Sequence, residues 1–597
     1  MYNVSEAYKT EMRQEVRNFS YMKIKFGVTD PDALRYGYVS ATSSKLAYSS
    51  EPDLVDEKNV SRRYGTLEPG FWLLDGSKNT FPTNAGWQGF VSTGLSNDAG
   101  VISSPAFITI KFKQGDYYRF FGLTFRFDVR CQEWPENVTI KSYQNGTLID
   151  TQTHTVDNYE FVVESGIPAG EDTYLDTLVV EFSKTRIPRR RFRLEGITLG
   201  VYKNINESRI INAEWSRSND LMNTTAPIDE FNFSFYDEER FYNPENPSGI
   251  WSYLDAGQQI TTQYGYELDD GSIEWVPGGS HYTNGAPTVD DSGVLSQVSF
   301  KAVSRIQSLN DVYEAGIYND SGVTLYQLAV DVLTFMDLKP VDYVLSNSLK
   351  SYSTKAPLPV LTARELLQLI ANAGMCVLYV NRNNQIVFET RNNSTVQDFT
   401  FNNDCVYDAQ PTLKKYPVLK ELTTVVHRLV KGAELEELAT VDIETATGEI
   451  YTVDYEMGTG IQITVSTGLT LNQTYMIGSY RAKVQLTGSG TVTVKGYPIN
   501  DYTYSITNAF NVKGDPCSVD NQLITHEGHC RLFNSWLASV LSRRNQYHFE
   551  ERGFPEIDIA DNVLIDTYYV AEGQATVVAN KISYNGALKA ETEVLGI

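Results

Sequence analysis

The sequence predicts a fold that is mainly β with some α, divided into several domains. The chain has 597 residues, about four times the ~150 residues of a typical domain, and its 41% hydrophobic and 21% charged residues exclude global disorder. It contains 38 Tyr, 27 Phe and 42 Gly, a usage that favours strands and turns over helices. Short alternating apolar and polar stretches recur, whereas three segments have clear helical periodicity.

The clearest series of strands lies between residues 103 and 202. Turn signals such as Gln144-Asn145-Gly146 separate the alternating stretches at the spacing of a sandwich. No helix of three turns fits this region, so we expect an antiparallel β-sandwich. The predicted strands are FITIKF (107–112), GLTFRFD (122–128), NVTIKSY (137–143), TLVVEF (177–182) and RFRLEGITLGVY (191–202).

Three amphipathic helices are predicted at 322–338, 362–373 and 526–543. Each spaces its apolar residues at the helical period, so each should pack one face on a sheet. The second opens with a capping box, in which Thr362 and Glu365 satisfy backbone N–H groups reciprocally.

Charge divides the chain near residue 204. The formal net charge is −24, of which residues 1–204 contribute −1 and the remainder −23. Such an acidic chain should repel nucleic acid, which argues against a DNA reader. Its 5 cysteines are scattered, which is not typical of a disulfide framework, and we expect neither a signal peptide nor a membrane span.

Residues 70–203 resemble the galactose-binding-like, discoidin-type jelly roll of carbohydrate-binding modules. The resemblance depends on SPAFITIKF followed by GLTFRFD, and on the closing IPRRRFRLEGITLGVY. It describes a scaffold and implies little about a ligand.

Most of residues 205–597 resemble the baseplate hub, or tail-tip (tail-associated), proteins of long-tailed bacteriophages. The order of the segments is more specific than any single motif. These segments are FYNPENPSGI (241–250), QQITTQYGYEL (258–268), the Trp-x-Pro-Gly-Gly turn at 275–279, KAVSRIQSLND (301–311), SGVTLYQLAVDVL (321–333), TARELLQLIANAGMCVLYVNRNNQIVF (362–388), and the stretches that begin at 531 and 582.

The resemblance implies two hub β-barrels, a small α/β connecting domain and an inserted β-sandwich jelly roll. In the family the first barrel starts near the amino terminus, and VRNFSYMKIKFGVTD (16–30) supplies that strand. The implied parts are an N-terminal helix with the first barrel strand (1–44), the inserted jelly roll (45–203), the rest of barrel one (204–308), the connecting domain (309–410), and the second barrel with a packed helix (411–597).

The same resemblance implies a structural virion protein at the distal end of a tail. Three chains, each with two barrels, would give six similar barrels that can stack on a hexameric tube. The implied partners are itself as a homotrimer, a distal tail protein or tail tube protein, the tape measure protein and host-surface carbohydrate. DNA would pass through the acidic lumen without specific binding.

The residues themselves predict no catalytic site, no cofactor and no metal site, so we expect no enzyme. The segment His526-Glu527-Gly528-His529-Cys530 concentrates metal-capable side chains, but its histidines are three residues apart rather than four, and no third ligand is evident. Neither a Gly-x-Ser-x-Gly elbow nor a Walker loop occurs. Acidic pairs such as Glu133 and Glu136 are typical of solvated turns.

Glycan binding by the module is the one binding hypothesis that side chains suggest. Exposed aromatic planes with polar neighbours bind the C–H faces of sugar rings. The same residues would otherwise pack the core of the module or brace it against the barrel. The candidates are Trp72, Trp87, Tyr117, Tyr118, Arg119 and Trp134.

Alternatives from other classes stay open. They are a cell-wall-degrading tail enzyme, the hub of a phage-derived bacteriocin or injection machine, and a free glycan-binding adhesin. The sequence pattern does not distinguish contractile from non-contractile tails, nor does it identify the host.

Overall fold

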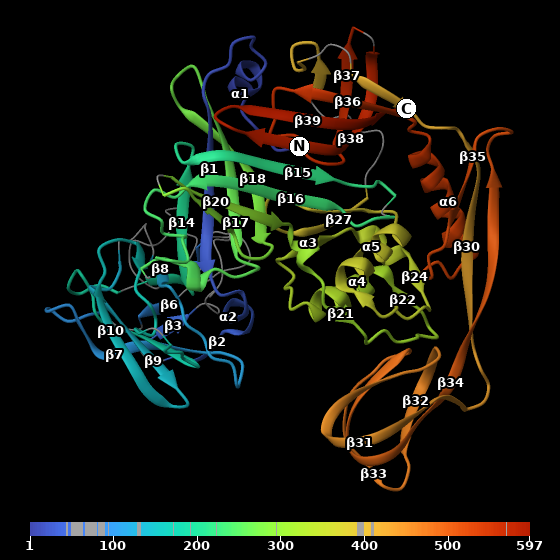
Figure 1. The fold of residues 1–597 in the computed structure, drawn as a ribbon, viewed down its shortest axis with the longest axis horizontal. Helices are drawn as coiled ribbons and strands as arrows, with labels where there is room; N and C mark the ends of the chain where they lie inside the picture. The colour runs from blue at the N-terminus through green and yellow to red at the C-terminus, as the bar shows by residue number, and fades with distance from the viewer. Residues whose placement is uncertain are drawn as a thin grey trace.

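The computed structural model consists mainly of β-strands, with six α-helices among the described residues, and so confirms the predicted fold class (Figure 1). The residues that the structure describes are 1–42, 46–48, 64–65, 80–81, 90–92, 95–127, 133–170, 172–191, 193–222, 224–246, 248–293, 295–390, 399–407, 411–568 and 570–596. None of the helices in these ranges combines the length and apolar character needed to cross a bilayer.

A 14-stranded sheet forms the centre of the molecule. Its first half, the first β unit, runs in the spatial order β14-β1-β17-β18-β20-β16-β15, with β19 paired to β20. These strands are β1 (Ser20–Thr29), β14 (Gly200–Asn206), β15 (Ile210–Ser218), β16 (Ile228–Tyr236), β17 (Gln259–Glu267), β18 (Ile273–Thr283), β19 (Thr288–Asp291) and β20 (Ser296–Val303).

The first β unit curves around a core of alternate residues. In β16, Phe231, Phe233 and Phe235 point inward and stack in sequence, with ring centroids 5.4 and 5.9 Å apart. In β1, Ile24 and Phe26 are buried in the same core, whereas the neighbouring Lys23 and Lys25 face outward. The period of two in the sequence therefore gives each strand one apolar and one polar face.

The second β unit comes from the other end of the chain and continues the same sheet. Strand β38 pairs antiparallel with β15 from Ala213↔Tyr584 to Ser218↔Ala579, and β39, β36 and β29 follow in order. The strands of this unit are β28 (Thr400–Asn402), β29 (Thr412–Lys415), β36 (Asn545–Glu551), β37 (Asn562–Thr567), β38 (Val570–Tyr584) and β39 (Leu588–Gly596). Helix α1 (Glu6–Glu11) packs on this unit through Tyr8.

The module is a β-sandwich of two five-stranded sheets packed around a single core. One sheet has the order β10-β9-β12-β7-β2 and the other β11-β8-β13-β6-β3. Its elements are α2 (Pro31–Tyr36), β2 (Tyr38–Thr42), β3 (Leu46–Tyr48), β6 (Phe90–Ser92), β7 (Val101–Lys111), β8 (Leu123–Phe127), β9 (Asn137–Gln144), β10 (Thr147–Thr155), β11 (Glu160–Val163), β12 (Thr177–Lys184) and β13 (Arg193–Thr198), beside the separate pair β4 (Tyr64–Gly65) and β5 (Thr80–Phe81).

The module enters and leaves the sheet at one place. Thr29 at the end of β1 is the pairing partner of Gly200 at the start of β14. The stretch 191–202, predicted as one sandwich strand, therefore divides at Gly200 into β13 and β14. A Cβ on Gly200 would lie 2.3 Å from the carbonyl oxygen of Val28, and its φ is +151°, so glycine is required at this turn.

The sequence placed the start of the module at residue 45, but the structure draws this boundary earlier. Strand β2 pairs with β7 of the sandwich, and Ala33 of α2 is buried in the sandwich core. Strand β2 has only five residues, so its apolar pattern does not indicate which sheet it joins. Its pairing with β7 therefore places it in the module.

The connecting domain packs two helices against short strands, and α6 joins the same core. All three predicted helices are confirmed, and the Thr362/Glu365 capping box is formed. The elements are α3 (Arg305–Ser308), β21 (Val312–Tyr313), β22 (Val323–Thr324), α4 (Leu325–Phe335), β23 (Tyr343–Leu345), β24 (Ser353–Thr354), β25 (Leu361–Thr362), α5 (Ala363–Ala373), β26 (Val377–Val380), β27 (Ile386–Glu389) and α6 (Glu527–Leu541), with a 3-10 turn at Asn347–Ser351. A second 3-10 turn, at Trp251–Tyr253, belongs to the first β unit.

Residues 419–519 form a separate sheet, the arm, inside the segment that the sequence assigned to the second barrel. Its outer strands have a core of their own and project beyond the connecting domain, at the lower right of Figure 1. Glu314 of the connecting domain accepts a hydrogen bond from Arg481 at 2.7 Å. The strands are β30 (Leu419–Lys431), β31 (Glu436–Asp454), β32 (Gly458–Val465), β33 (Leu469–Ile477), β34 (Arg481–Ala509) and β35 (Asp515–Val519).

Candidate functional site: the polar junction of the β units

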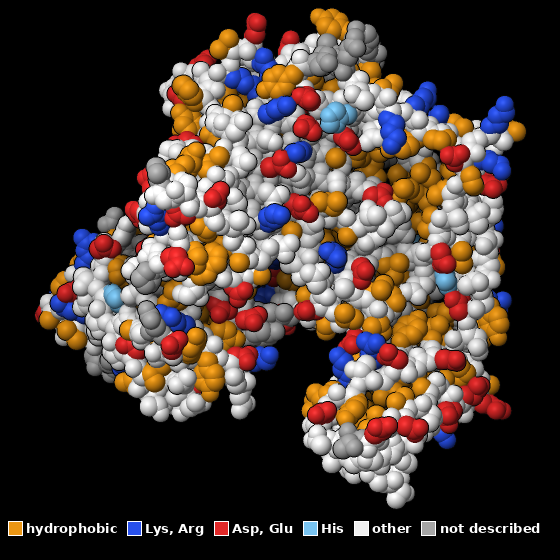
Figure 2. Space-filling view, viewed as in Figure 1, with side chains coloured by type: hydrophobic (Ala, Val, Ile, Leu, Met, Phe, Trp, Pro, Cys, Tyr) orange, Lys and Arg blue, Asp and Glu red, His pale blue; other side chains and the backbone are white. Residues whose placement is uncertain are grey.

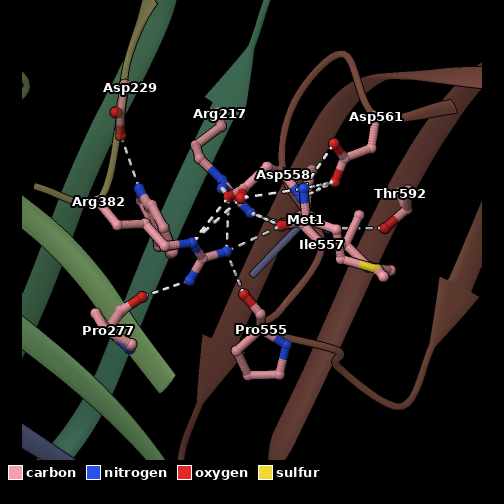
Figure 3. A network of polar contacts seen from close by, with 12 residues as sticks. Met1, Arg217, Asp229, Pro277, Arg382, Pro555, Ile557, Asp558, Asp561 and Thr592 are labelled. Atoms are coloured by element: carbon pink, nitrogen blue, oxygen red, sulfur yellow. Dashed lines mark hydrogen bonds and ion pairs between the residues drawn. The ribbon is translucent and has the colours of Figure 1, made fainter. Parts of the chain in front are cut away.

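Charged side chains from three parts of the chain meet where the two β units join. Arg217 comes from β15, Arg382 from the turn between β26 and β27, and Asp558 from the loop between β36 and β37. Figure 3 shows both guanidinium groups pointing at the Asp558 carboxylate. We call this group the junction.

The Asp558 carboxylate receives hydrogen bonds from both arginines. Arg382 donates from Nη2 at 2.6 Å and from Nε at 3.0 Å, and Arg217 donates from Nη1 at 3.1 Å. Burial alone would raise the pKa of Asp558, but the two guanidinium groups outweigh it and hold that pKa well below its usual range. The carboxylate therefore stays ionised and compensates two cations.

Backbone carbonyls accept further hydrogen bonds from both arginines. Arg382 donates to Pro277 O of β18 and to Pro555 O, the latter at 2.6 Å, while Arg217 donates to Ile557 O at 2.9 Å (Figure 3). A single arginine of the connecting domain thus touches both β units. The planar guanidinium suits this role because it presents several donors in fixed directions.

A second carboxylate fixes the neighbouring residues of the first β unit. Asp229 accepts from the indole nitrogen of Trp215 at 2.7 Å and from His281 Nε2 at 2.8 Å. Burial would raise the pKa of Asp229, but contact with His281 lowers it overall. The Trp215 ring in turn lies under Arg217, with 3.8 Å between the guanidinium carbon and the ring centroid.

The local sequence explains how Arg382 reaches the junction. Asn381 accepts backbone hydrogen bonds from Asn383 and Gln385 through its side chain, and Asn384 has a φ of 60°. Asparagine favours such tight turns. The turn therefore projects Arg382 away from the hairpin and toward the sheet.

A cavity of about 420 Å³ opens beside the junction and is lined by Arg217, Asp229, Arg382, Asp558 and Asp561 among others. In this wall Arg217 and Arg382 bind Asp558, and Asp561 accepts from the amino group of Met1 at 2.8 Å. Asp229 is held by Trp215 and His281 behind the wall. This arrangement can fasten the β units and the connecting domain together, and it presents no activated nucleophile among the lining residues.

Two carboxyl groups lie buried near α1, close to the junction. Burial raises the pKa of Glu551 to about 8, and the neighbouring Glu556 adds to this rise. Burial raises the pKa of Glu556 to about 7, although Arg382 and Arg17 lower it in part. Glu551 accepts from Thr592 at 2.8 Å, and Glu556 accepts from the Tyr8 hydroxyl at 3.4 Å. Both carboxyls are protonated in the folded protein at mildly acidic pH.

The six glycan candidates differ in whether the structure describes them and in how exposed their side chains are. Trp72 and Trp87 lie outside the described residues. Tyr118 and Trp134 are 5% and 7% exposed in the sandwich core, which contradicts their assignment as sugar platforms because a buried ring has no free face. Their rings pack in the apolar core of the sandwich instead.

The other two candidates differ in exposure. Arg119 lies over the Tyr253 ring of the first β unit, 5.0 Å from its centroid, and so braces the module against the sheet. Tyr117 is 44% exposed and donates to Asn145 at 3.2 Å. Of the candidates within the described ranges, Tyr117 presents the most open ring.

The His526–Cys530 segment begins α6. His526 is the residue before the helix, and His529 donates from Nε2 to the Ala373 carbonyl at 2.7 Å while stacking on Tyr352. Burial lowers the pKa of His529. These contacts join α6 to the connecting domain.

No protein-family model matches the chain, and no curated protein matches it in sequence. Among solved structures, the matches include tail proteins and a component of a type VI secretion system. The tail protein from Neisseria meningitidis MC58 is 9% identical, with a TM-score of 0.38 over 66% of this chain and 93% of that one. The 43 kDa tail protein of prophage MuSo2 from Shewanella oneidensis is 11% identical, with a TM-score of 0.37 over 66% and 95% of the two chains.

A third solved structure, the prophage tail protein gp18 from Listeria monocytogenes EGD-e, is 10% identical, with a TM-score of 0.35. It covers 66% of this chain and 91% of its own length.

We predict that Asp558→Asn lowers the free energy of unfolding by about 3 kcal/mol, because it leaves two buried guanidinium groups without a counter-charge. Urea denaturation followed by tryptophan fluorescence measures this change, since Trp215 contacts Arg217. The matched control is Asp566→Asn, which alters an exposed carboxylate of β37. Equal denaturation midpoints for the two variants would contradict the role of the junction.

We also predict that the stability of the second β unit falls as pH rises from about 5 to about 8. Glu551 and Glu556 have ordinary pKa values of 4.5 but are raised to about 8 and about 7 in the fold. The folded state therefore binds more protons than the unfolded state across this window, and stability must decrease with pH there. Glu551→Gln should flatten the dependence of the melting temperature on pH, whereas Glu550→Gln, at an exposed position of the same strand, should not. Parallel pH profiles for both variants would sink this prediction.

Proposed function

We propose that this chain is a structural virion protein, the hub that closes the distal end of a phage tail tube. The observation that carries the proposal is the continuous sheet, in which one chain supplies two curved β units joined through β15 and β38. The ordered hub-like segments of 205–597 occupy this sheet and the connecting domain.

Three copies of the chain would present six such units around one axis. A hexameric tube or distal tail ring needs six similar contacts, and a trimer of paired units supplies them while keeping closed symmetry. The partners under this proposal are a distal tail protein or tail tube protein and the tape measure protein. The net charge of −23 after residue 204 suits a lumen through which DNA passes without binding.

We further propose that the chain is not an enzyme. The charged groups at the junction bind one another, and Glu133, one of the acids considered for hydrolysis, accepts from the buried Arg193 at 2.9 Å. That carboxylate is engaged in an ion pair with arginine rather than directed at a substrate. The hub of a phage-derived bacteriocin or injection machine remains the second candidate, and the presence of capsid genes beside this gene separates the two.

Light scattering of the purified full chain should give three times the 67.1 kDa of one chain at micromolar concentration. The same preparation should release neither reducing sugar nor peptide from peptidoglycan. A mass that stays at one chain would count against the trimer, and release of either product would refute the non-enzymatic role.

The module is proposed to contact host-surface carbohydrate, and the exposed ring of Tyr117 supports this role. On a glycan array, Tyr117→Ala in the full chain should weaken any bound signal about tenfold, because an aromatic platform is lost. Tyr159→Ala is the control, since Tyr159 is 40% exposed elsewhere on the module. Equal loss in both variants, or no loss in either, would exclude Tyr117 from a glycan site.

A further inference from the structure

The outer face of the first β unit carries a polar surface where it faces the connecting domain. Lys23 and Lys25 alternate with the buried residues of β1 and therefore point outward. Across the sheet, Lys25 pairs with Asn204 of β14 and with Thr261 of β17, and Lys23 pairs with Gln263. The outer face of β1 and its two neighbouring strands therefore carries amide, hydroxyl and ammonium groups side by side.

The connecting domain forms the opposite wall of a cavity of about 410 Å³. Its contribution comes from the β26–β27 turn, with Asn383 and Gln385, and from Arg305 beside Asp342. Figure 2 shows a hollow between the module and the connecting domain, with basic side-chain atoms at its depth. The volume lies in the range of small-molecule sites, roughly 300–1,000 Å³.

The cavity is lined by Lys23, Lys25, Arg305 and Arg382 and by one carboxylate, Asp342, although the chain as a whole is acidic. Asp342, the carboxylate in the wall, is neutralised by Arg305, whose Nη1 donates to it at 2.9 Å. Lys23 lies over the Trp275 ring at 3.8 Å, and Lys25 lies over the Tyr202 ring at 4.6 Å. Aromatic rings favour a cation in place, so both ammonium groups are held at the wall.

Neutral hydrogen-bonding groups surround the two ammonium groups. The side chains of Asn204, Thr261, Gln263 and Asn383 line the cavity, and none of them makes a hydrogen bond to another described residue. Amides donate and accept at once, which suits the hydroxyl groups of a sugar. The cations suit an oxyanion.

We propose that this cavity binds a hydroxyl-rich anionic ligand of small size, namely a sugar that carries a carboxylate or a phosphate. The ammonium groups of Lys23 and Lys25 take the oxyanion, and the amides of Asn204, Gln263 and Asn383 take the hydroxyls. The proposal is independent of the hub function, because it depends only on the two walls of the cavity. It also differs from the glycan contact of the module, which lies at Tyr117.

Saturation-transfer difference NMR on the full chain tests the site with three probes: glucuronate, glucose 1-phosphate and glucose. Both charged sugars should receive saturation, with an affinity that falls as salt rises, and neutral glucose should receive far less. A signal from glucuronate alone or from glucose 1-phosphate alone assigns the oxyanion. Equal signals from all three probes, or none from the charged ones, would overturn the proposal.

Variants locate the site. Lys23→Gln should weaken the binding of the charged probe about tenfold, the loss expected for one charge-assisted hydrogen bond, and Asn383→Ala should weaken it through the opposite wall. Lys301→Gln is the control, because it removes an exposed lysine of β20 on the same unit. Binding that depends on Lys301 as much as on Lys23, or that is unchanged in both cavity variants, would place the ligand elsewhere and refute the assignment.

Discussion

Strand β38 pairs with β15 along the edge where the first β unit would otherwise end. Without this pairing each unit would expose a row of unpaired backbone groups, which is a costly and aggregation-prone edge. The pairing also fixes Arg217, which lies within the paired stretch, beside the loop that carries Asp558. The connecting domain is positioned by the same carboxylate, because Arg382 binds Asp558 from the β26–β27 turn. One strand pairing and one shared carboxylate therefore orient three parts of the chain.

The module and the outer part of the arm are each inserted at the ends of a pair of antiparallel strands. The module leaves and returns between the paired residues Thr29 and Gly200, and the outer arm leaves and returns beside the paired residues Lys431 and Ile499. Each appendage has its own apolar core. Insertions at paired strand ends leave the pairing of the parent strands intact, so each parent sheet accommodates its insertion without a change in register.

The alternation of β1 links the core to the surface chemistry. Its apolar residues fill the core of the first β unit, and its lysines face the connecting domain across a polar cavity. Because successive side chains of a strand point to opposite faces, the same ten residues contribute to both. The junction and the cavity share Arg382 in their walls, which joins the two polar regions through one turn.

The strand-rich class, the three helices and the sandwich could all be predicted from the sequence, because apolar periodicity and helix capping are local properties. Alternation in β15 also places Arg217 on the same face as Trp215, which indicates that this arginine is buried and needs a polar partner. The alternation does not indicate that the partner is Asp558. Tertiary structure alone decided that 191–202 divides between two sheets, that 419–519 leaves the second β unit, and that Tyr118 and Trp134 are core residues. These outcomes depend on which strands pair and on what covers each face, and contacts between residues hundreds of positions apart set both.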